Sequence, residues 1–299
     1  MAIENMGMYI EKANTLIEAL PYIRQFRKKI IVIKYGGSFM YDQNIKKSVV
    51  DDVALMKLVG LRPILIHGGG KDISSLLNQL NIETKFVNGL RVTTDEVVKV
   101  AEMVLSGKIN KEIVQLLQER DINSVGISGK DGGLLRVKKK MSEDQDIGYV
   151  GEITRVKNDL ITDLLKNDYV PIISPIGCDK YGQTYNINAD HVAYAVAKNL
   201  HAEKLVYLTD TDGVYADHDD PDSIIRRLGI NEVPHLIETG VISGGMIPKV
   251  ENAVDAIESG VRSVHILDGR IEHSLLLELF TSAGCGTMIR RELPQYSKE

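Results

Sequence analysis

Six short β-branched runs alternate with longer amphipathic segments from residue 30 onward, and this alternation constrains the fold more than any other feature. Apolar residues recur at helical spacing between the runs. Near-continuously apolar strands joined by helices predict an α/β fold, a three-layer αβα sandwich around a mostly parallel sheet. The expected strands are Ile30–Ile33, Pro63–Ile66, Ser124–Ile127, Pro171–Ser174, Leu205–Leu208 and Ser263–Leu267. The expected helices are Val49–Val59, Ile73–Leu80, Glu96–Leu105, Lys108–Glu119, Ala189–Leu200 and Val250–Ser259.

Composition and net charge exclude some classes of binding partner. Hydrophobic residues make up 43% of the 299 residues and charged residues 26%, which is typical of a globular protein. The 36 Lys and Arg face 41 Asp and Glu, a net charge of −5, so the chain has no overall basic field to hold nucleic acid or an anionic membrane. We expect neither partner. An anionic ligand must therefore meet a local positive site.

The cysteines and the apolar runs indicate the compartment. Cys178 and Cys285 lie far apart without metal-ligand spacing, which argues against a disulfide scaffold or a zinc finger. No apolar run approaches the ~18–20 residues of a membrane helix, and charged residues interrupt the segment 1–29. We expect a cytoplasmic protein.

Three units are expected along the chain. Residues 1–28 form a helix that Pro21 kinks, and this helix packs either on its own domain or, as an oligomerisation arm, on another subunit. A glycine- and asparagine-bearing connection near Pro175–Asn188 divides an N-terminal lobe, 29–180, from a C-terminal lobe, 181–299, with one sheet shared between them. The charged stretch Lys138–Gly148 indicates an exposed hairpin tip or loop.

Three glycine clusters follow expected strands: KYGGS from Lys34, HGGGK from His67 and SGGMIPK from Ser243. Glycine allows backbone N–H groups to approach a ligand closely. Where a helix begins just afterwards, these groups form a site for phosphate or a developing oxyanion. A single such cluster is usually only a turn, but several with a lysine nearby favour an anion site.

Other signatures for phosphate or acyl chemistry are missing. The chain contains no GxGxxG, no GxxxxGK[ST], no HRD or DFG triplet and no GxSxG. This excludes the dinucleotide fingerprint, the P-loop, the protein-kinase motifs and the α/β-hydrolase elbow. A phosphate-handling α/β enzyme with its own loops remains.

Three further strings supply polar ligands. NGLRVT, from Asn88, places Arg91 after a glycine turn, where a guanidinium can bind a carboxylate bidentately or simply remain solvated. NINAD, from Asn186, opens a helix, and Asn188 or Asp190 can cap it, whereas capping does not explain Asn186. TDTDGVY, from Thr209, follows a strand as a nucleotide-contacting loop or as a local acidic turn.

In this order, over nearly the whole chain, these strings resemble the acetylglutamate kinases of the amino acid kinase family. The resemblance implies transfer of the γ-phosphoryl of MgATP to the side-chain carboxylate of N-acetyl-L-glutamate in arginine biosynthesis, with ATP and Mg²⁺ as cofactors and no confident metal ligand from the protein. It implies catalytic Lys34, Lys249 and Asp190, with Gly36 and Gly37 at the phosphoryl group. Acetylglutamate would contact Gly69, Gly70, Arg91 and Asn186. ATP would contact Asp210, Thr211, Asp212, Gly213, Val214, Tyr215, Val241, Ile242 and Ser243.

The N-terminal helix, the string His265–Arg270 and the stretch from His273 to Met288 resemble the arginine-inhibited branch of that family. This implies inhibition by L-arginine and a homohexamer built as a trimer of dimers, with Tyr22, Lys204, His273 and Glu278 as arginine contacts. Two alternatives stay open. One is an acyl kinase for an aminoadipate-type substrate carried on a protein, and the other is a catalytically silent arginine-binding regulator.

Overall fold

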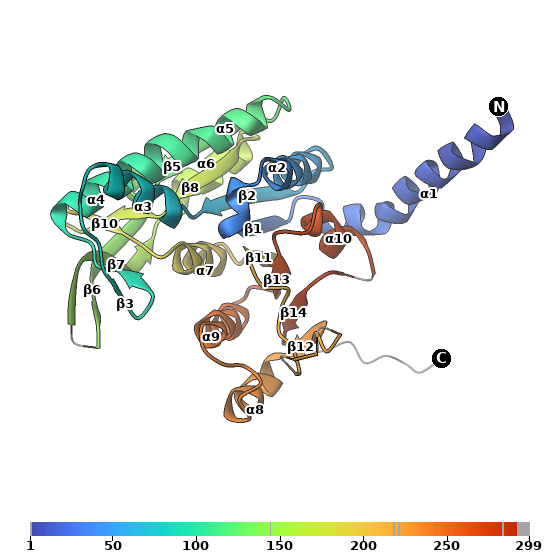
Figure 1. Ribbon diagram of the computed structural model, residues 1–299. Coiled ribbons are helices and arrows are strands. Elements are labelled where there is room, and N and C mark those ends of the chain that lie inside the picture. The colour runs from blue at the N-terminus through green and yellow to red at the C-terminus, as the bar shows by residue number, and fades with distance from the viewer. Residues whose placement is uncertain (1, 144, 218, 221, 283, 292–299) are drawn as a thin grey trace.

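An eight-stranded sheet runs through the centre of the computed structural model, which describes residues 2–143, 145–217, 219–220, 222–282 and 284–291 (Figure 1). Its strand order is β12-β14-β13-β11-β1-β2-β8-β5, and every neighbouring pair is parallel except β13 and β14. The six predicted strands are confirmed. The strands are β1 (Ile30–Tyr35), β2 (Arg62–His67), β5 (Ser124–Ser128), β8 (Val170–Ser174), β11 (Lys204–Thr209), β12 (Arg227–Gly229), β13 (Ser263–Asp268) and β14 (Thr287–Arg290).

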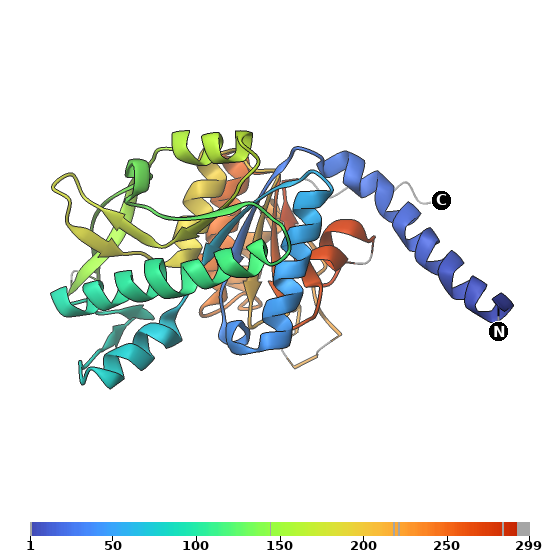
Figure 2. The same ribbon diagram turned by 90° about the horizontal axis from the view of Figure 1, so that it is seen from above.

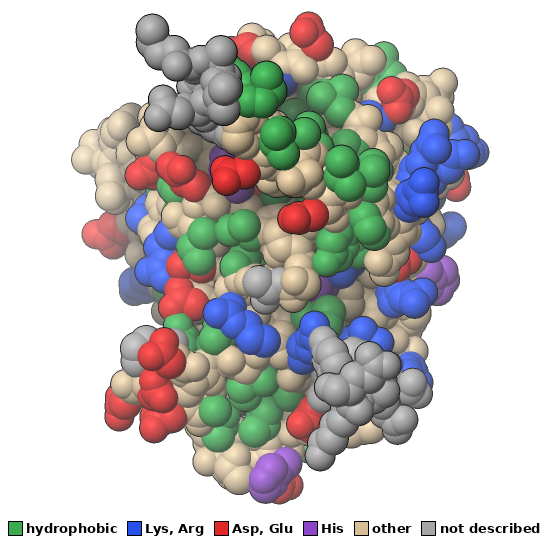
Figure 3. Space-filling view, turned by 90° about the vertical axis from the view of Figure 1, so that its right-hand side faces the viewer, with side chains coloured by type: hydrophobic (Ala, Val, Ile, Leu, Met, Phe, Trp, Pro, Cys, Tyr) green, Lys and Arg blue, Asp and Glu red, His purple; other side chains and the backbone are tan. Residues whose placement is uncertain are grey.

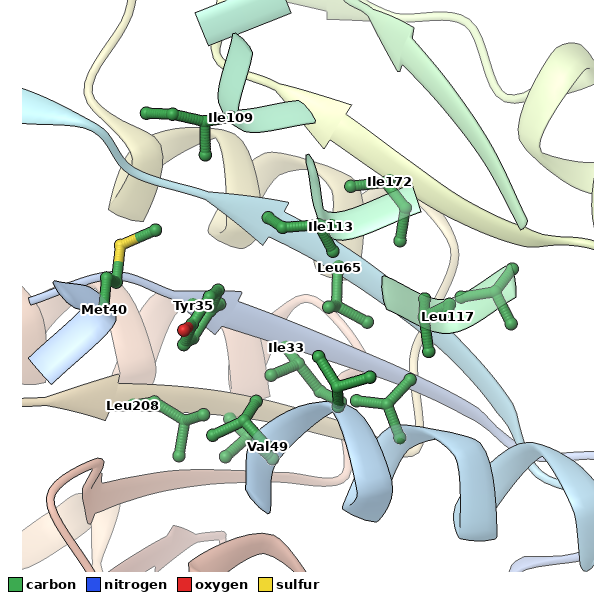
Figure 4. Close-up of a cluster of buried hydrophobic side chains, with 14 of the residues drawn as sticks. Ile33, Tyr35, Met40, Val49, Leu65, Ile109, Ile113, Leu117, Ile172 and Leu208 are labelled. Carbon is green, nitrogen blue, oxygen red and sulfur yellow. The ribbon is translucent and has the colours of Figure 1, made fainter. Parts of the chain in front are cut away.

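Helices cover both faces of this sheet, which confirms the predicted sandwich. On one face Ile33 and Leu65 pack with Val49 of α2 and Leu117 of α5 (Figure 4). A second apolar cluster on the other face joins the sheet to α6, α7 and α9. The helices are α2 (Gln43–Leu58), α3 (Gly70–Gln79), α4 (Asp95–Glu102), α5 (Asn110–Gln118), α6 (Asp159–Lys166), α7 (Ala189–Asn199), α8 (Val233–Glu238), α9 (Met246–Glu258) and α10 (Ser274–Phe280).

The two helices predicted on either side of Ser106 are one continuous helical run, so the predicted break is wrong. A π-helical segment, Met103–Ile109, joins α4 to α5 without an interruption. Gly107 is a poor helix former, costing about 1 kcal/mol relative to Ala, but the buried flanking residues Val104, Leu105 and Ile109 hold the helix together across it. π-Segments are rare and often lie at functional sites.

Strands that the pattern did not reveal build one side of the molecule. A small closed barrel contains β6 (Leu135–Ser142), β7 (Gln145–Val156), β9 (Ile176–Cys178) and β10 (Thr184–Asn186). The hairpin of β3 (Phe86–Val87) and β4 (Leu90–Arg91) lies beside it. The stretch 138–148 spans the β6–β7 connection, which confirms a hairpin tip. The described residues also form short 3₁₀ turns at Ser38–Tyr41, Asp131–Gly133 and Ile230–Glu232.

Helix α1 (Ala2–Phe26) projects away from the body of the molecule (Figures 1 and 2). Pro21 lies inside this helix, and the predicted kink there stays a prediction. The face of the molecule from which α1 projects carries grouped hydrophobic side chains (Figure 3). Among the described residues, the helices are too short or too polar to cross a bilayer. Among the described side chains of α1, the large apolar ones that are exposed are Met6, Tyr9, Ile10, Leu16, Ile17 and Leu20.

Candidate active site

One carboxylate lies between two ammonium groups at the carboxyl ends of the central strands. Lys34, near the end of β1, places Nζ 3.0 Å from Oδ1 of Asp190. Lys249, in the first turn of α9, places Nζ 3.8 Å from Oδ2 of the same carboxylate. Asn188 caps α7 by accepting the backbone N–H of Asp190 at 2.8 Å, which fixes Asp190 in the first turn of that helix. Three separate elements therefore meet at Asp190.

The charges in this triad depend on one another. Burial by itself would raise the pKa of Asp190, but Lys34 and then Lys249 outweigh it and lower that pKa. Burial lowers the pKa of Lys249, opposed by the carboxylate of Asp190. Nζ of Lys249 also donates to Oγ1 of Thr209 at 3.2 Å and lies 6.0 Å from the ring of Tyr207. Asp190 is thus ionised at neutral pH and supports both cations.

The glycine loop after β1 approaches the chain after β2 very closely. A Cβ on Gly36 would lie 2.9 Å from Cε of Lys34 and 3.4 Å from the backbone nitrogen of Gly68. A Cβ on Gly37 would meet the Phe39 ring at 2.6 Å and Oδ1 of Asp210 at 2.8 Å. Glycine is needed at Gly37 because the ring of Phe39 occupies the space, whereas a side chain at Gly36 would displace the end of the Lys34 side chain. The loop consequently brings backbone N–H groups beside Lys34.

A cavity of about 470 Å³ opens beside Lys34, a volume suited to a small ligand. Gly36, Gly37, Gly68, Gly69 and Gly70 line it together with Arg91, Asn186 and Asp190. The remaining described residues of its lining are Lys34, Ser38, Met40, Tyr41, Lys71, Ile73, Phe86, Gly89, Leu90, Leu105, Val150, Pro175, Ile187, Asn188, Ala189 and Asp210.

Arg91 is a buried cation in the lining of this first cavity. Its side chain is held in place by hydrogen bonds from Nη2 to the carbonyl of Gly70 at 2.9 Å and to Oγ of Ser74 at 2.8 Å. The guanidinium carbon lies 4.7 Å from the centre of the Phe86 ring, on the β3–β4 hairpin. Only 7% of Arg91 is exposed, and burial lowers its pKa. A carboxylate in the cavity would find an oriented guanidinium there.

A second cavity, of about 330 Å³, adjoins the first at Asp210, which lines both. Both oxygens of Asp210 accept the backbone N–H of Ser38, each at 2.9 Å, and this pair ties β11 to the glycine loop. The other lining residues are Thr211, Asp212, Gly213, Val214, Tyr215, Val241, Ser243, Met246 and Arg270.

The structure brings nearly all residues of the predicted site to these two cavities. Two of the predicted residues line neither cavity. Ile242 is 1% exposed and packs in the core between its lining neighbours Val241 and Ser243. Lys249 joins the site through its contacts with Asp190 and Thr209 instead. Sequence reasoning missed Ser38, Lys71 and Arg270, all of which face a cavity. Within the described chain, no group of three or more His, Cys, Asp or Glu side chains is arranged to hold a metal ion.

The four residues predicted as arginine contacts divide between two clusters and a helix. Nζ of Lys204 lies 2.9 Å from Nε2 of His265, whose Nδ1 is 2.6 Å from Oε1 of Glu278. His273 instead pairs with Asp52 of α2, with 2.6 Å between Nδ1 and Oδ1. Tyr22 packs from α1 against the core. His265, which links Lys204 to Glu278, was not among the predicted contacts.

Comparison with known proteins decides the family. The model of the amino acid kinase family matches residues 29–268. The chain belongs to the amino acid kinase family. An acetylglutamate kinase of Carboxydothermus hydrogenoformans is 51% identical to this amino acid kinase, over 95% of this chain and 99% of that protein. One from Methanosphaera stadtmanae is 51% identical, over 93% and 97%.

Solved structures agree with this placement. The N-acetylglutamate synthase of Neisseria gonorrhoeae, complexed with coenzyme A and N-acetyl-glutamate, matches this amino acid kinase with a TM-score of 0.82 and 29% identity. The match covers 94% of this chain and 64% of the synthase. The carbamate kinase of Giardia lamblia bound to AMP-PNP, at 17% identity and a TM-score of 0.65, shares the fold.

Proposed function

We propose that this amino acid kinase transfers the γ-phosphoryl group of MgATP to the side-chain carboxylate of N-acetyl-L-glutamate, in the cytoplasm. The products are N-acetyl-L-glutamyl 5-phosphate and ADP, in arginine biosynthesis. The observation that carries the proposal is the carboxylate of Asp190 between Lys34 and Lys249, beside two adjoining cavities. The acetylglutamate kinases at about half identity support the choice of acceptor.

The chemistry needs charge relief and no general base. A carboxylate with a pKa of ~4.3 is already ionised at pH 7, so it can attack phosphorus without losing a proton. The obstacle is repulsion between this anion and the triphosphate. Oriented cations and N–H donors offset such repulsion most where charge develops in the transition state. Lys34 and Lys249 converge from two halves of the molecule and can act on one phosphoryl group from opposite sides.

Asp190 acts by holding both lysines in place and by keeping Lys249 charged against burial. The N–H groups of Gly36, Gly37 and Gly69 add donors around the phosphoryl group. In the first cavity Gly70, Arg91 and Asn186 hold acetylglutamate, with the guanidinium of Arg91 on its α-carboxylate. A Mg²⁺ ion bound to the nucleotide would supply further neutralisation of phosphate charge.

The second cavity holds the nucleotide. The predicted residues that line it are Asp210, Thr211, Asp212, Gly213, Val214, Tyr215, Val241 and Ser243. Ile242 acts behind this wall by fixing its two neighbours. Because Asp210 lines both cavities, the nucleotide and its acceptor meet at the glycine loop.

Hydroxylamine trapping of the acyl phosphate tests the reaction. ATP-dependent hydroxamate formation with free acetylglutamate is expected. Formation only with an aminoadipate-type acceptor carried on a protein would favour that alternative enzyme. If neither acceptor is phosphorylated, the remaining alternative is a catalytically silent arginine-binding regulator.

Inhibition by L-arginine and a hexameric assembly complete the proposal. The gonococcal synthase that matches this chain with a TM-score of 0.77 was solved with L-arginine. The Lys204–His265–Glu278 cluster lies near α1, because Nζ of Lys204 is 4.9 Å from the centre of the Phe26 ring. Tyr22, Lys204, His273 and Glu278 are the proposed contacts, and α1 joins dimers into a trimer of dimers. Adding arginine to the hydroxamate assay tests the inhibition directly.

A further inference from the structure

Arg270 lines the nucleotide cavity, although it lies after β13 and outside every loop assigned to the nucleotide. We propose that Arg270 is a nucleotide-binding residue, which fixes the 210–215 loop and directs its remaining guanidinium edge to the phosphates of the bound nucleotide. This inference rests on the proposed function of the second cavity as the nucleotide site.

Two carboxylates bind the guanidinium on one side. Nε of Arg270 donates to Oδ1 of Asp268 at 2.8 Å, and Nη2 donates to Oδ2 of the same carboxylate at 2.8 Å. Nη2 also donates to Oδ1 of Asp212 at 2.7 Å. Asp268 is buried and accepts the backbone N–H of Arg270 at 2.8 Å, so the guanidinium is anchored to the end of β13. The orientation of the guanidinium plane is thereby set.

One edge of the same guanidinium remains available. Within the described part of the chain, Nη1 makes no hydrogen bond or ion pair, while 52% of the side chain is exposed at the cavity. Asp268 and Asp212 raise the pKa of Arg270 still further, so the group stays charged. A rigid, charged donor pair facing a cavity is the arrangement that binds phosphate oxygens.

The second cavity is lined by carboxylates, so the binding of an anionic nucleotide there needs the positive charge of Arg270. Its lining contains Asp210 and Asp212, and Arg270 is the only cation among the described residues that line it. Asp210 is satisfied by the backbone N–H and the hydroxyl of Ser38, at 2.9 and 3.0 Å. Asp212 is paired with Arg270 and accepts from Tyr215. Without Arg270, a polyphosphate would meet two carboxylates and no lining cation.

Arg270 and Lys249 therefore contact different phosphates of the nucleotide. Lys249 is engaged with Asp190 at the phosphoryl group that moves, whereas Arg270 is fixed to β13 on the nucleotide side of Asp210. A contact with phosphates that do not move binds ground state and transition state alike. It consequently lowers KM for ATP and leaves kcat nearly unchanged.

The test measures binding of Mg·AMP-PNP by calorimetry, without any acceptor, in the full chain. Arg270→Gln is expected to weaken this binding by about ten- to a hundredfold, the size of a lost hydrogen bond to a charged group. Arg262→Gln is the matched control, because Arg262 is 75% exposed and pairs at 3.5 Å with Glu203, outside the cavity. Binding by Arg270→Gln within twofold of the control would overturn the proposal.

A double variant separates direct contact from loop positioning. If Arg270 acted only by neutralising Asp212, the pair Arg270→Gln and Asp212→Asn would bind Mg·AMP-PNP normally. Direct contact predicts that the double variant stays at least tenfold weak, and full restoration would overturn this part. Kinetics should show a raised KM for ATP with an unchanged KM for acetylglutamate. Normal AMP-PNP binding without acetylglutamate turnover would contradict the proposed function alone.

Discussion

The carboxylate of Asp190 lies 3.0 Å from Nζ of Lys34 and 3.8 Å from Nζ of Lys249, although these lysines come from the first strand and the ninth helix. Only the folded sheet brings them together. A single anion therefore holds two cations at one point and opposes the burial that lowers the pKa of Lys249, and the predictions on the catalytic groups follow from this arrangement.

Lys34→Ala and Lys249→Ala are each expected to lower kcat by about a hundred- to a thousandfold, since each removes a donor that acts on the transition state, about 3–4 kcal/mol. KM for acetylglutamate should change far less. Steady-state kinetics on both substrates measures this split. Equal losses in kcat and in acetylglutamate affinity would contradict the assigned role.

Asp190→Asn should shift the alkaline limb of the pH–rate profile to lower pH. Asp190 is the main group that raises the pKa of Lys249 against burial, and Lys34 lowers it. Without the carboxylate, Lys249 loses its proton at a lower pH, and activity falls there. An alkaline limb at the wild-type position in the variant would contradict this coupling.

Arg91→Ala is expected chiefly to raise KM for acetylglutamate, by about ten- to a hundredfold, because it removes a charge-assisted bond to the α-carboxylate. Its kcat at saturation should stay within a few-fold of the wild type. Arg91→Lys keeps the charge but not the two-pronged geometry, so it should recover only part of the affinity. A normal KM in Arg91→Ala would show that the substrate assignment is wrong.

Gly69 and Gly70, in the glycine cluster that follows β2, offer a matched pair. A Cβ on Gly69 would lie 2.4 Å from Cδ1 of Ile109 and 2.7 Å from Cδ2 of Leu105, on the π-helical segment. A Cβ on Gly70 would have nothing within 4 Å. Gly69→Ala should lower kcat/KM more than tenfold, by displacing the loop from the π-segment. Gly70→Ala should keep the wild-type free energy of unfolding, because its added methyl group meets no protein atom. Ile109→Ala should partly restore the kcat/KM of Gly69→Ala.

The sequence predicted the parts of this molecule that local pattern controls. The six central strands and the glycine loops follow from apolar runs and turn chemistry, and the capping of α7 by Asn188 follows from residue type. The roles of Lys34, Lys249 and Asp190 came from resemblance, because no local rule pairs residues so distant in sequence.

Tertiary packing decides what the sequence did not predict. The π-segment Met103–Ile109 depends on close packing against Gly69. In the small barrel, β9 and β10 have three residues each, too few for periodicity to show. The longer β6 and β7 include the charged stretch 138–148, which the sequence favoured as a hairpin tip or loop. Arg270 reaches Asp212 across 58 positions of sequence, so only the fold reveals it. Ile242 points into the core because its neighbours take the cavity side.

Deletion of residues 1–26 should leave dimers, since the exposed apolar face of α1 is the proposed contact that joins dimers into a ring. Light scattering on the full and truncated chains measures the change in mass. The charged substitution Ile17→Lys, at a residue 61% exposed, should have the same effect without removing the helix. Hexamers that survive both changes would refute the role of the arm.

The free energy of unfolding should decrease as the pH falls from about 6.5 to 5. Burial lowers the pKa of His67 and of His265 to about 4, against ~6.5 in the unfolded chain. The unfolded chain therefore binds up to two more protons on these residues in this window, and acid favours unfolding. Asp52 has the opposite effect on stability: burial raises its pKa to about 6 in the folded protein, so the folded chain takes up a proton there as the pH falls.

Asp52→Asn should consequently steepen the pH dependence of stability. In the wild type, the proton that folded Asp52 binds between pH 6 and 5 offsets one of the protons that the unfolded histidines bind. Removing this offset should increase the loss of stability by about 1.4 kcal/mol per pH unit at most. Asp190 does not interfere, since its pKa is already below 3.8. Urea unfolding at pH 6.0, 5.5 and 5.0 measures both slopes, and parallel slopes would show that Asp52 is not protonated in the folded state.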